Sequence, residues 1–229
     1  MRWLVLIVLL LVAGCTGGGT GGKDVTLTTE DGVKIAATYY AGGERGVILL
    51  HMLGRSRGDY AGLAQELNTR GFSVIAIDLR GHGQSEGNWR SFSPREFNAM
   101  TLDVRAAKEY LVSRGVKPGR IGIVGASIGA NIALRYAAED RDIKTVVLLS
   151  PGLDYRGVVT EDAARQLRSA FFAASEEDTY AYSSTERLYS LAEGEKVFER
   201  LRGAGHGTEM LDASPQLRKK VIAWLEARL

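Results

Sequence analysis

Apolar and polar residues follow two patterns along most of this chain, and each pattern predicts a different element. Short runs that are apolar throughout are typical of strands buried on both faces of a sheet. Longer segments with apolar residues three or four positions apart are typical of helices that pack one face on a sheet. Because the two kinds of segment alternate, the sequence predicts a mostly parallel central sheet with helices on both faces.

The largely apolar runs predict strands at 46–50, 72–77, 120–124, 145–149 and 170–174, and a further strand is predicted at 196–201. The segments with helical spacing predict helices at 59–70, 95–114, 128–138, 161–169, 185–192 and 215–229. Residues 24–40 form two β-rich runs around Asp31-Gly32, which predicts an antiparallel hairpin with a tight turn. We find no internal repeat and no second domain, so residues 24–229 are expected to form one domain.

The first 14 residues contain three kinds of segment in order: a charged residue, an apolar run and two small residues. Arg2 is followed by an unbroken apolar run from Leu4 to Val12, and Ala13-Gly14 supplies two small residues. This order is typical of a secretory signal peptide. The apolar run is shorter than the roughly 20 residues that a spanning helix needs. We therefore predict that residues 1–14 are an export signal.

Cys15, the one cysteine of the chain, follows this segment directly. Residues 12–15 (Val-Ala-Gly-Cys) resemble the lipobox of prokaryotic lipoproteins, whose cysteine is lipidated and becomes the new N-terminus. The resemblance implies that lipid on Cys15, followed by a glycine-rich tether over residues 15–23, holds an exported domain on the outer face of the cell membrane or in the periplasm. A short uncleaved anchor, or an ordinary signal peptide with a chance cysteine, remains open, and both still place the domain outside the cytoplasm.

Charge and composition narrow the classes of partner. The chain has 29 Lys and Arg and 27 Asp and Glu, for a formal net charge of +2, with no basic block that would favour nucleic acid. A structural zinc site is not expected, because the chain has one cysteine and its three histidines lie far apart in the sequence. We predict no metal and no cofactor, and the sequence makes no prediction of oligomeric state.

Residues 125–129 (Gly-Ala-Ser-Ile-Gly) match the pattern G-x-S-x-G around Ser127. They lie between a predicted strand and a predicted helix, where this pattern forms a sharp turn that exposes the serine hydroxyl as a nucleophile. The N-terminus of the helix behind the turn favours negative charge. The alternative is a glycine-rich turn in which Ser127 only caps the helix.

With this motif in place, the chain resembles the α/β-hydrolase superfamily, and within it the small dienelactone-hydrolase-like and serine-esterase members. The segments that carry the resemblance are 49–57, 78–87, 125–130, 148–154, 171–178 and 203–207. The resemblance implies the α/β-hydrolase fold. Dienelactone hydrolases have a cysteine nucleophile, so Ser127 favours ordinary ester or related acyl substrates. The segment between the strands at 145–149 and 170–174 is too short for a helical cap domain, so none is expected.

The resemblance also implies a base and an acid, because the superfamily carries serine, acid and histidine in that order. His206 is the expected base, since it alone leaves room for an acid after Ser127, whereas His51 and His82 match loop positions. Asp178, after the strand at 170–174, is the expected acid. Alternatives for the acid are Asp154, which also suits a turn, Glu176 and Glu177.

An oxyanion hole needs two backbone N–H groups. The resemblance implies Ile128, directly after the nucleophile, and Leu53, in the loop after the strand at 46–50. Met52 stands where the superfamily usually has glycine and is the second candidate in that loop. Three loop aromatics, Trp89, Phe92 and Tyr155, either line a pocket or only pack.

These residues predict acyl transfer. Ser127 attacks a carbonyl, His206 takes its proton, and Asp178 orients the imidazole. We expect a serine hydrolase of the carboxylesterase type that acts on a small-molecule ester. A non-catalytic surface binding protein on the same fold, and a serine peptidase or perhydrolase, remain alternatives.

The predicted anchor can be tested on the full chain in a bacterial host. Wild type should partition with membranes, and its mature N-terminal peptide should carry diacylglycerol on Cys15 by mass spectrometry. Cys15→Ala should carry no lipid and leave the membrane fraction. A mature N-terminus at another residue without lipid would contradict the lipoprotein prediction and leave the fold prediction intact.

Overall fold

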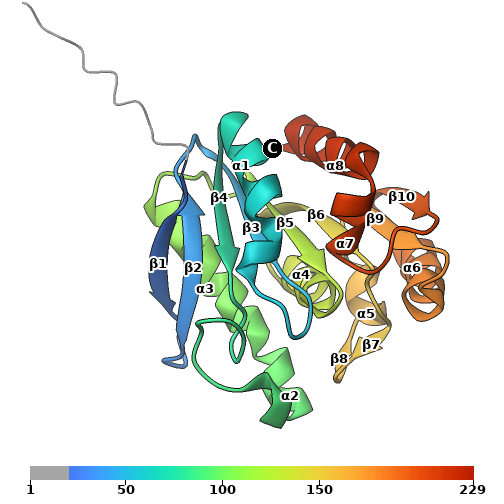
Figure 1. The fold of residues 1–229 in the computed structure, drawn as a ribbon, viewed down its shortest axis with the longest axis horizontal. Helices are drawn as coiled ribbons and strands as arrows, with labels where there is room; N and C mark the ends of the chain where they lie inside the picture. Colours follow the sequence, from blue (N-terminus) through green and yellow to red (C-terminus); the bar gives the residue numbers. More distant parts are fainter. Residues whose placement is uncertain (1–20) are drawn as a thin grey trace, which may run out of the picture.

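A computed structural model describes residues 21–229 of the protein (Figure 1). The predicted signal peptide at 1–14, Cys15 and the predicted tether up to residue 20 lie outside the described residues. Lys23, predicted as the end of the tether, is the first residue of β1 and pairs with Tyr39. Within residues 21–229 we find no helix with the length and apolar content needed to cross a bilayer.

An eight-stranded sheet forms the centre of the molecule. Its strands, in chain order, are β1 (Lys23–Thr28), β2 (Lys34–Tyr40), β3 (Arg45–Leu50), β4 (Phe72–Ile77), β5 (Ile121–Ala126), β6 (Ile143–Leu149), β9 (Ser169–Ser175) and β10 (Glu195–Leu201). Their spatial order is β1-β2-β4-β3-β5-β6-β9-β10. The six strands from β4 to β10 are parallel, and β2 runs antiparallel to β1 and β4. This confirms the predicted mostly parallel sheet with an antiparallel N-terminal hairpin.

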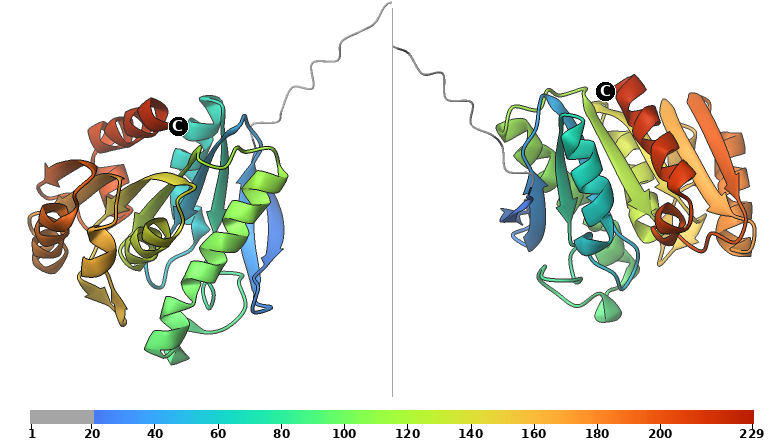
Figure 2. Two further views of the ribbon diagram at one scale, coloured as in Figure 1. Left: turned by 180° about the vertical axis from the view of Figure 1, so that it is seen from behind. Right: turned by 45° about the horizontal axis from the view of Figure 1, so that its top comes forward.

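Helices cover both faces of the sheet, which explains why its inner strands are apolar throughout (Figures 1 and 2). One face packs on α1 (Ala61–Thr69), α7 (Glu209–Ala213) and α8 (Pro215–Arg228). The other packs on α3 (Met100–Ser113), α4 (Ile128–Glu139) and α6 (Thr179–Leu191). All six residues of β4 and all six of β5 are buried between these layers.

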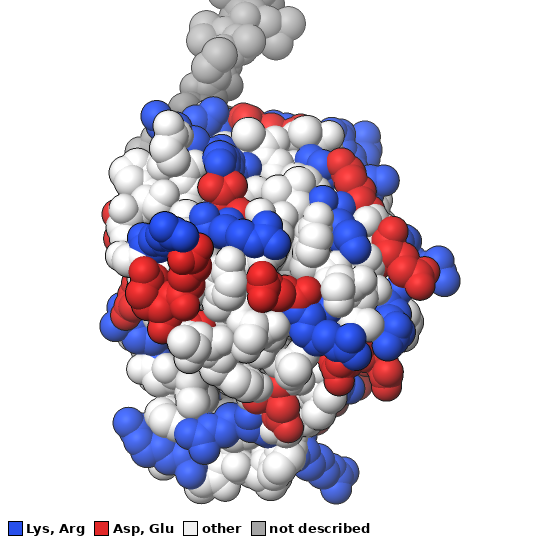
Figure 3. Space-filling model, turned by 90° about the vertical axis from the view of Figure 1, so that its right-hand side faces the viewer, with Lys and Arg blue, Asp and Glu red and all other residues white. Residues whose placement is uncertain are grey.

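The edge strand β10 differs from the inner strands. It alternates exposed with half-buried residues and carries the charged residues Glu195, Lys196, Glu199 and Arg200. Figure 3 shows that charges of both signs are interspersed on this side of the molecule. Charged side chains on an edge strand oppose pairing with another chain.

Several short elements differ from the prediction. The predicted helix at 95–114 is two helices, α2 (Pro94–Asn98) and α3, which meet at Ala99; a capping box between Ser93 and Glu96 starts the first of them. The predicted helix at 161–169 is only α5 (Glu161–Ala164). The predicted helix at 185–192 is part of α6, which begins at Thr179, and α7 was not predicted.

The segment between β6 and β9 carries a small hairpin that the sequence analysis also missed. Its strands are β7 (Asp154–Tyr155) and β8 (Val158–Val159). Two-residue strands are too short to produce a recognisable alternation. Between β6 and β9 the chain forms only this hairpin and α5, so no helical cap domain covers the sheet, as predicted.

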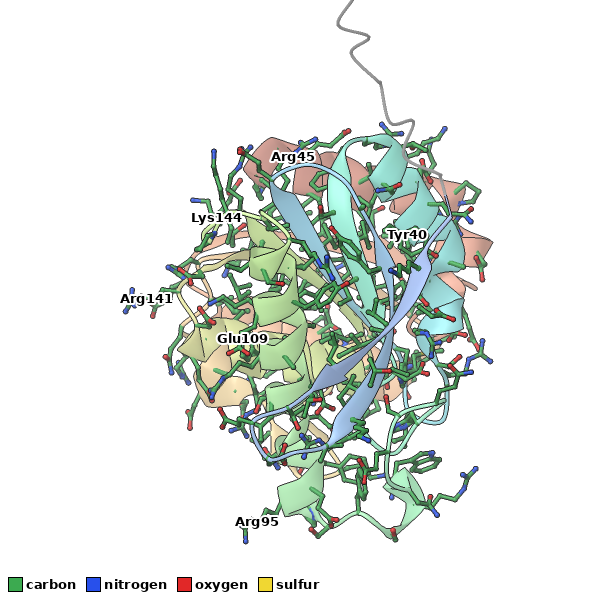
Figure 4. All side chains as sticks on the ribbon, turned by 90° about the vertical axis from the view of Figure 1, so that its left-hand side faces the viewer. Tyr40, Arg45, Arg95, Glu109, Arg141 and Lys144 are labelled. Carbon is green, nitrogen blue, oxygen red and sulfur yellow. The ribbon has the colours of Figure 1, made fainter. Side chains whose placement is uncertain are left out.

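The loops that carry chemistry leave the sheet at one end. Figure 4 shows Arg45, at the start of β3, and Arg95, in α2, at opposite ends of the molecule. The parallel strands run from the Arg45 end toward the α2 end, so their carboxyl-terminal loops meet near α2. This is where open α/β sheets bind their ligands.

Arg80, in the loop after β4, ties this end together. Its Nε donates to Asp103 Oδ1 of α3 at 2.8 Å, and its backbone N–H donates to Asp103 Oδ2 at 2.8 Å. Its terminal nitrogens donate to Asp31, in the β1–β2 turn, at 2.7 and 3.0 Å. The Asp103 carboxylate is fully buried, so Arg80 is what compensates its charge.

Arg80→Met should therefore lower the free energy of unfolding by about 3–5 kcal/mol, because it leaves the Asp103 carboxylate buried without a positive partner, bonded only to the backbone N–H of residue 80. Urea denaturation followed by circular dichroism measures the change. The matched control is Arg105→Met, which breaks an exposed pair with Glu30 and should cost less than about 1 kcal/mol. Equal effects of the two substitutions would show that the buried pair does not stabilise this fold.

Candidate active site

Ser127 lies in a strained turn between β5 and α4. Its backbone has φ 53° and ψ −119°, a conformation that residues with a side chain rarely adopt. The surrounding structure holds it there, since the Ser127 N–H donates to Leu149 O of β6 at 2.8 Å. The turn brings the serine to the carboxyl-terminal end of the sheet, with 7% of the residue exposed.

Two glycines let the strand and helix approach each other closely around this turn. A Cβ on Gly125 would lie 2.3 Å from the carbonyl oxygen of Gly129. A Cβ on Gly129 would lie 2.4 Å from the carbonyl oxygen of Leu50 and 2.6 Å from that of His51. The G-x-S-x-G pattern is thus required by backbone contacts on both sides of Ser127.

His206 and Asp178 are in direct contact. His206 lies in the loop between β10 and α7, and Asp178 lies between β9 and α6. The imidazole Nδ1 is hydrogen-bonded to Asp178 Oδ2, and the two side chains are 35% and 22% exposed. This arrangement leaves the Nε2 edge of His206 free to face a reacting group.

The three alternative acids have other partners. Asp154 Oδ1 accepts from Gly157 N at 2.7 Å and closes a turn. Glu176 pairs with Arg202 at 2.7 Å, and Glu177 accepts from Ser175 Oγ at 2.7 Å. Of the four acids considered, the structure brings Asp178 to His206.

Two buried serines that the sequence analysis missed hold the His206 loop. Ser150 Oγ accepts from Gly207 N at 3.0 Å, and Ser175 Oγ accepts from Ala204 N at 3.0 Å. Both serines are fully buried at the carboxyl-terminal ends of neighbouring strands. A polar residue that directly follows an apolar strand was the available signal, because a buried hydroxyl at such a position needs a partner.

Tyr155, on β7, links the serine to the histidine. Its hydroxyl lies near Ser127 and donates to Ser150 O at 3.4 Å, and its ring lies edge-on to the imidazole of His206, with centroids 6.4 Å apart. Burial raises the pKa of Tyr155 above its ordinary value, and the charge of Asp178 raises it further. The phenol is therefore protonated and can donate a hydrogen bond.

The two expected oxyanion donors have free N–H groups. Among the hydrogen bonds of residues 21–229, none uses the N–H of Leu53 or of Ile128, which opens α4. The N–H of Met52 is likewise unpaired within this part of the chain. Trp89 packs against the turn that follows Leu53, with its Cζ2 3.5 Å from where a Cβ on Gly54 would lie.

His51 fixes the shape of this loop and does not act as a base. Its Nε2 accepts from Leu79 N at 3.0 Å, so its Nδ1 carries the proton and donates to Met52 O at 2.7 Å. The ring is fully buried and edge-on to His82, which stacks on Trp89. Burial lowers the pKa of His51 to about 4.

Met52, which replaces the usual glycine, points toward the His206 loop. A Cβ on Gly207 would lie 2.3 Å from Met52 Sδ, so the methionine fills the space that Gly207 leaves. The side chain is buried in the core on the α1 and α8 face. The oxyanion loop and the histidine loop thus pack directly on each other.

The described part of the chain has no cluster of metal-binding side chains. Within residues 21–229 no three His, Cys, Asp or Glu side chains lie close enough together to bind one. A cavity of about 400 Å³ lies away from Ser127 and His206, and its lining includes Tyr40, Arg57 and Asp78.

Comparison with known proteins identifies the family. The Hydrolase_4 family, described as serine aminopeptidase, S33, matches residues 44–223. This chain belongs to the Hydrolase_4 family. The predicted membership of the α/β-hydrolase superfamily is confirmed, and the family match includes Ser127 and His206.

Relatives of this Hydrolase_4 member are found in several bacteria. An uncharacterized protein of Mycobacterium tuberculosis strain H37Rv is 28% identical over 222 residues, covering 86% of this chain and 76% of that protein. An AB hydrolase superfamily protein of Bacillus subtilis is 33% identical over 130 residues, covering 56% of this chain and 42% of its own.

Solved structures share the fold. An esterase of Pyrococcus furiosus superposes with a TM-score of 0.75 at 23% identity, covering 90% of this chain and 92% of its own. An acetyl xylan esterase of Paenibacillus sp. R4 gives 0.77 at 20% identity, covering 90% of this chain and 83% of its own.

The buried state of His51 predicts a pH dependence of stability. An unfolded histidine titrates near pH 6.5, whereas folded His51 takes up its proton only near pH 4. Between these values the unfolded state binds the proton and the folded state does not, so the free energy of unfolding should fall as pH falls, by on the order of 3 kcal/mol.

Denaturant titrations of wild type and His51→Gln at pH 7 and pH 4.5 measure this effect. The glutamine variant should lose less stability than wild type between the two pH values, because it has no imidazole to protonate. An identical loss in both proteins would show that other groups cause the acid sensitivity.

Proposed function

We propose that this Hydrolase_4 member is a serine hydrolase that cleaves a carboxylic ester, or a related acyl bond, through Ser127, His206 and Asp178. The observation that carries the proposal is the hydrogen-bonded pair His206–Asp178 at the sheet end where Ser127 sits in a strained strand-to-helix turn. A purely structural serine has no need of that backbone strain, nor a structural histidine of a half-exposed carboxylate partner.

The reaction follows from these positions. His206 takes the proton of Ser127 as the hydroxyl oxygen attacks the carbonyl carbon, and Asp178 stabilises the imidazolium that forms. The N–H groups of Leu53 and Ile128 stabilise the oxyanion. His206 then protonates the leaving group, and an acyl-enzyme on Ser127 remains. Water, activated by His206, hydrolyses this ester and restores the serine.

Esters are the proposed substrate class for two reasons. Two proteins of known structure with this fold are named as esterases, one of them an acetyl xylan esterase. Ser127 also takes the place of the cysteine of the dienelactone hydrolases, the branch that the sequence resembles. Serine peptidase activity is the second candidate, because the family is described as serine aminopeptidase.

We also propose that lipid on Cys15 holds the domain at a membrane outside the cytoplasm. The described chain enters the fold at Lys23, opposite Tyr39 near the end of β2. That end of β2 pairs with the beginning of β4, so Lys23 lies at the opposite end of the sheet from Ser127. A domain tethered there would turn its active site away from the lipid, which favours a water-borne small-molecule substrate.

A fluorophosphonate probe and 4-nitrophenyl acetate test the proposal. Wild type should be labelled at Ser127 and should hydrolyse the ester. Ser127→Ala and His206→Ala should each lower kcat/KM by at least about 10⁴-fold without unfolding the protein. Asp178→Asn should be similarly severe, and the matched Asp154→Asn should keep near-wild-type activity.

The outcomes separate the candidate functions. Faster cleavage of aminoacyl 4-nitroanilides than of esters would favour the peptidase. A folded wild type with neither labelling nor turnover would favour a non-catalytic binding protein. A severe Asp154→Asn with a mild Asp178→Asn would overturn the choice of acid.

A further inference from the structure

The β7–β8 hairpin is positioned at the site without belonging to the Ser-His-Asp group. Figure 1 shows it projecting at the carboxyl-terminal end of the sheet, below α5. Its tip is a two-residue turn in which both Arg156 and Gly157 have positive φ, 57° and 81°. An arginine in this conformation is uncommon, which indicates that neighbouring contacts fix the turn.

Side chains from three helices hold the hairpin in place. Asn131 of α4 is fully buried; its Oδ1 accepts from Gly152 N at 2.9 Å and its Nδ2 donates to Val158 O at 2.9 Å. The hydroxyl of Tyr180, on α6, accepts from Asp154 N at 3.0 Å and donates to Asp154 O at 2.9 Å. These contacts make the hairpin a fixed wall.

A third helix holds the tip of the hairpin. Asn98 Nδ2 of α2 donates to Gly157 O at 3.0 Å. The hairpin is thus bonded at its base, its first strand and its tip, each time to a different helix. These hydrogen bonds restrict the movement of the hairpin, and therefore of the side chain that it places beside the active site.

Tyr155 is that side chain. Its hydroxyl donates to Ser150 O at 3.4 Å and lies near Ser127. Its ring packs edge-on to His206 and to Tyr180, the latter with centroids 5.6 Å apart. A Cβ on Gly152 would lie 2.7 Å from the ring, so the backbone at Gly152 also packs closely against the ring.

The contact with His206 indicates which part of a substrate Tyr155 would meet. The leaving group receives its proton from His206, so it must lie against the imidazole when the acyl bond breaks. A ring packed on that imidazole, with its hydroxyl near Ser127, borders the leaving-group side. The acyl group then lies on the side of Leu53 and Trp89.

We propose that Tyr155 determines leaving-group specificity: its fixed ring excludes groups that are branched next to the scissile bond. This inference rests on the proposed function, because it assumes that Ser127 and His206 carry out acyl transfer. The accepted substrates are then esters of primary alcohols or similarly slender leaving groups.

Two acetates that differ only in bulk beside the scissile bond test this directly: ethyl acetate and tert-butyl acetate. The kcat/KM for ethyl acetate divided by that for tert-butyl acetate should be at least about tenfold lower in Tyr155→Ala than in wild type. Tyr155→Phe keeps the ring and should keep the wild-type ratio. The matched control is Tyr182→Ala on α6, whose ring packs on Phe198 of β10 away from Ser127.

Fluorophosphonate labelling of Ser127 in each variant distinguishes failure of the proposed function from failure of this inference. No labelling of wild type would overturn the proposed function and this inference with it. Labelling with an unchanged ratio in Tyr155→Ala would overturn the inference alone. If Tyr155→Ala instead relieves discrimination between ethyl acetate and ethyl pivalate, Tyr155 borders the acyl side and the assignment is wrong. If Tyr155→Ala does not fold, Tyr155→Leu replaces it with the same expected direction.

Discussion

The close approach of α4 to the ends of β3 and β5 is the constraint on which the site depends. Gly129 brings the first turn of the helix against the carbonyls of Leu50 and His51, and Gly125 lets the strand pass the same helix. This contact leaves Ser127 no room for an ordinary conformation. It also sets the N-terminus of α4 beside the loop after β3, so that the free N–H groups of Ile128 and Leu53 lie on neighbouring backbones.

The support around that contact is polar and buried, and it is distributed over several strand ends. His51 holds the loop after β3 in place through both ring nitrogens. Its Nδ1 donates to the carbonyl of Met52, and its Nε2 accepts from the N–H of Leu79 in the loop after β4. Ser150 and Ser175 hold the histidine loop from β6 and β9. A buried polar group costs free energy when it loses its partner, so these bonds make one arrangement of the loops much more stable than others.

The sequence was sufficient for the sheet, because its five inner parallel strands are largely apolar and helical patterns separate most of them along the chain. It was also sufficient to predict Ser127 as the nucleophile, because the G-x-S-x-G motif lies between a predicted strand and a predicted helix. The structure brings the predicted acid and base, Asp178 and His206, together. Whether these residues are catalytic stays a prediction. The missed features depend on tertiary contacts: β7–β8 is held by Asn131 and Tyr180, and neither its two-residue strands nor its Arg156-Gly157 turn has a sequence signal strong enough to predict it. The split at Ala99 was missed because both helices continue one apolar pattern.

Met52 and Gly207 come from opposite halves of the sheet, yet they occupy one volume. With Gly207 unchanged, a glycine at position 52 would leave a cavity under the histidine loop. With Met52 unchanged, a side chain at position 207 would have to displace its sulfur atom and would also sit in the left-handed backbone region, with φ 58°. The sizes of these two residues therefore set how the oxyanion loop and the histidine loop pack on each other.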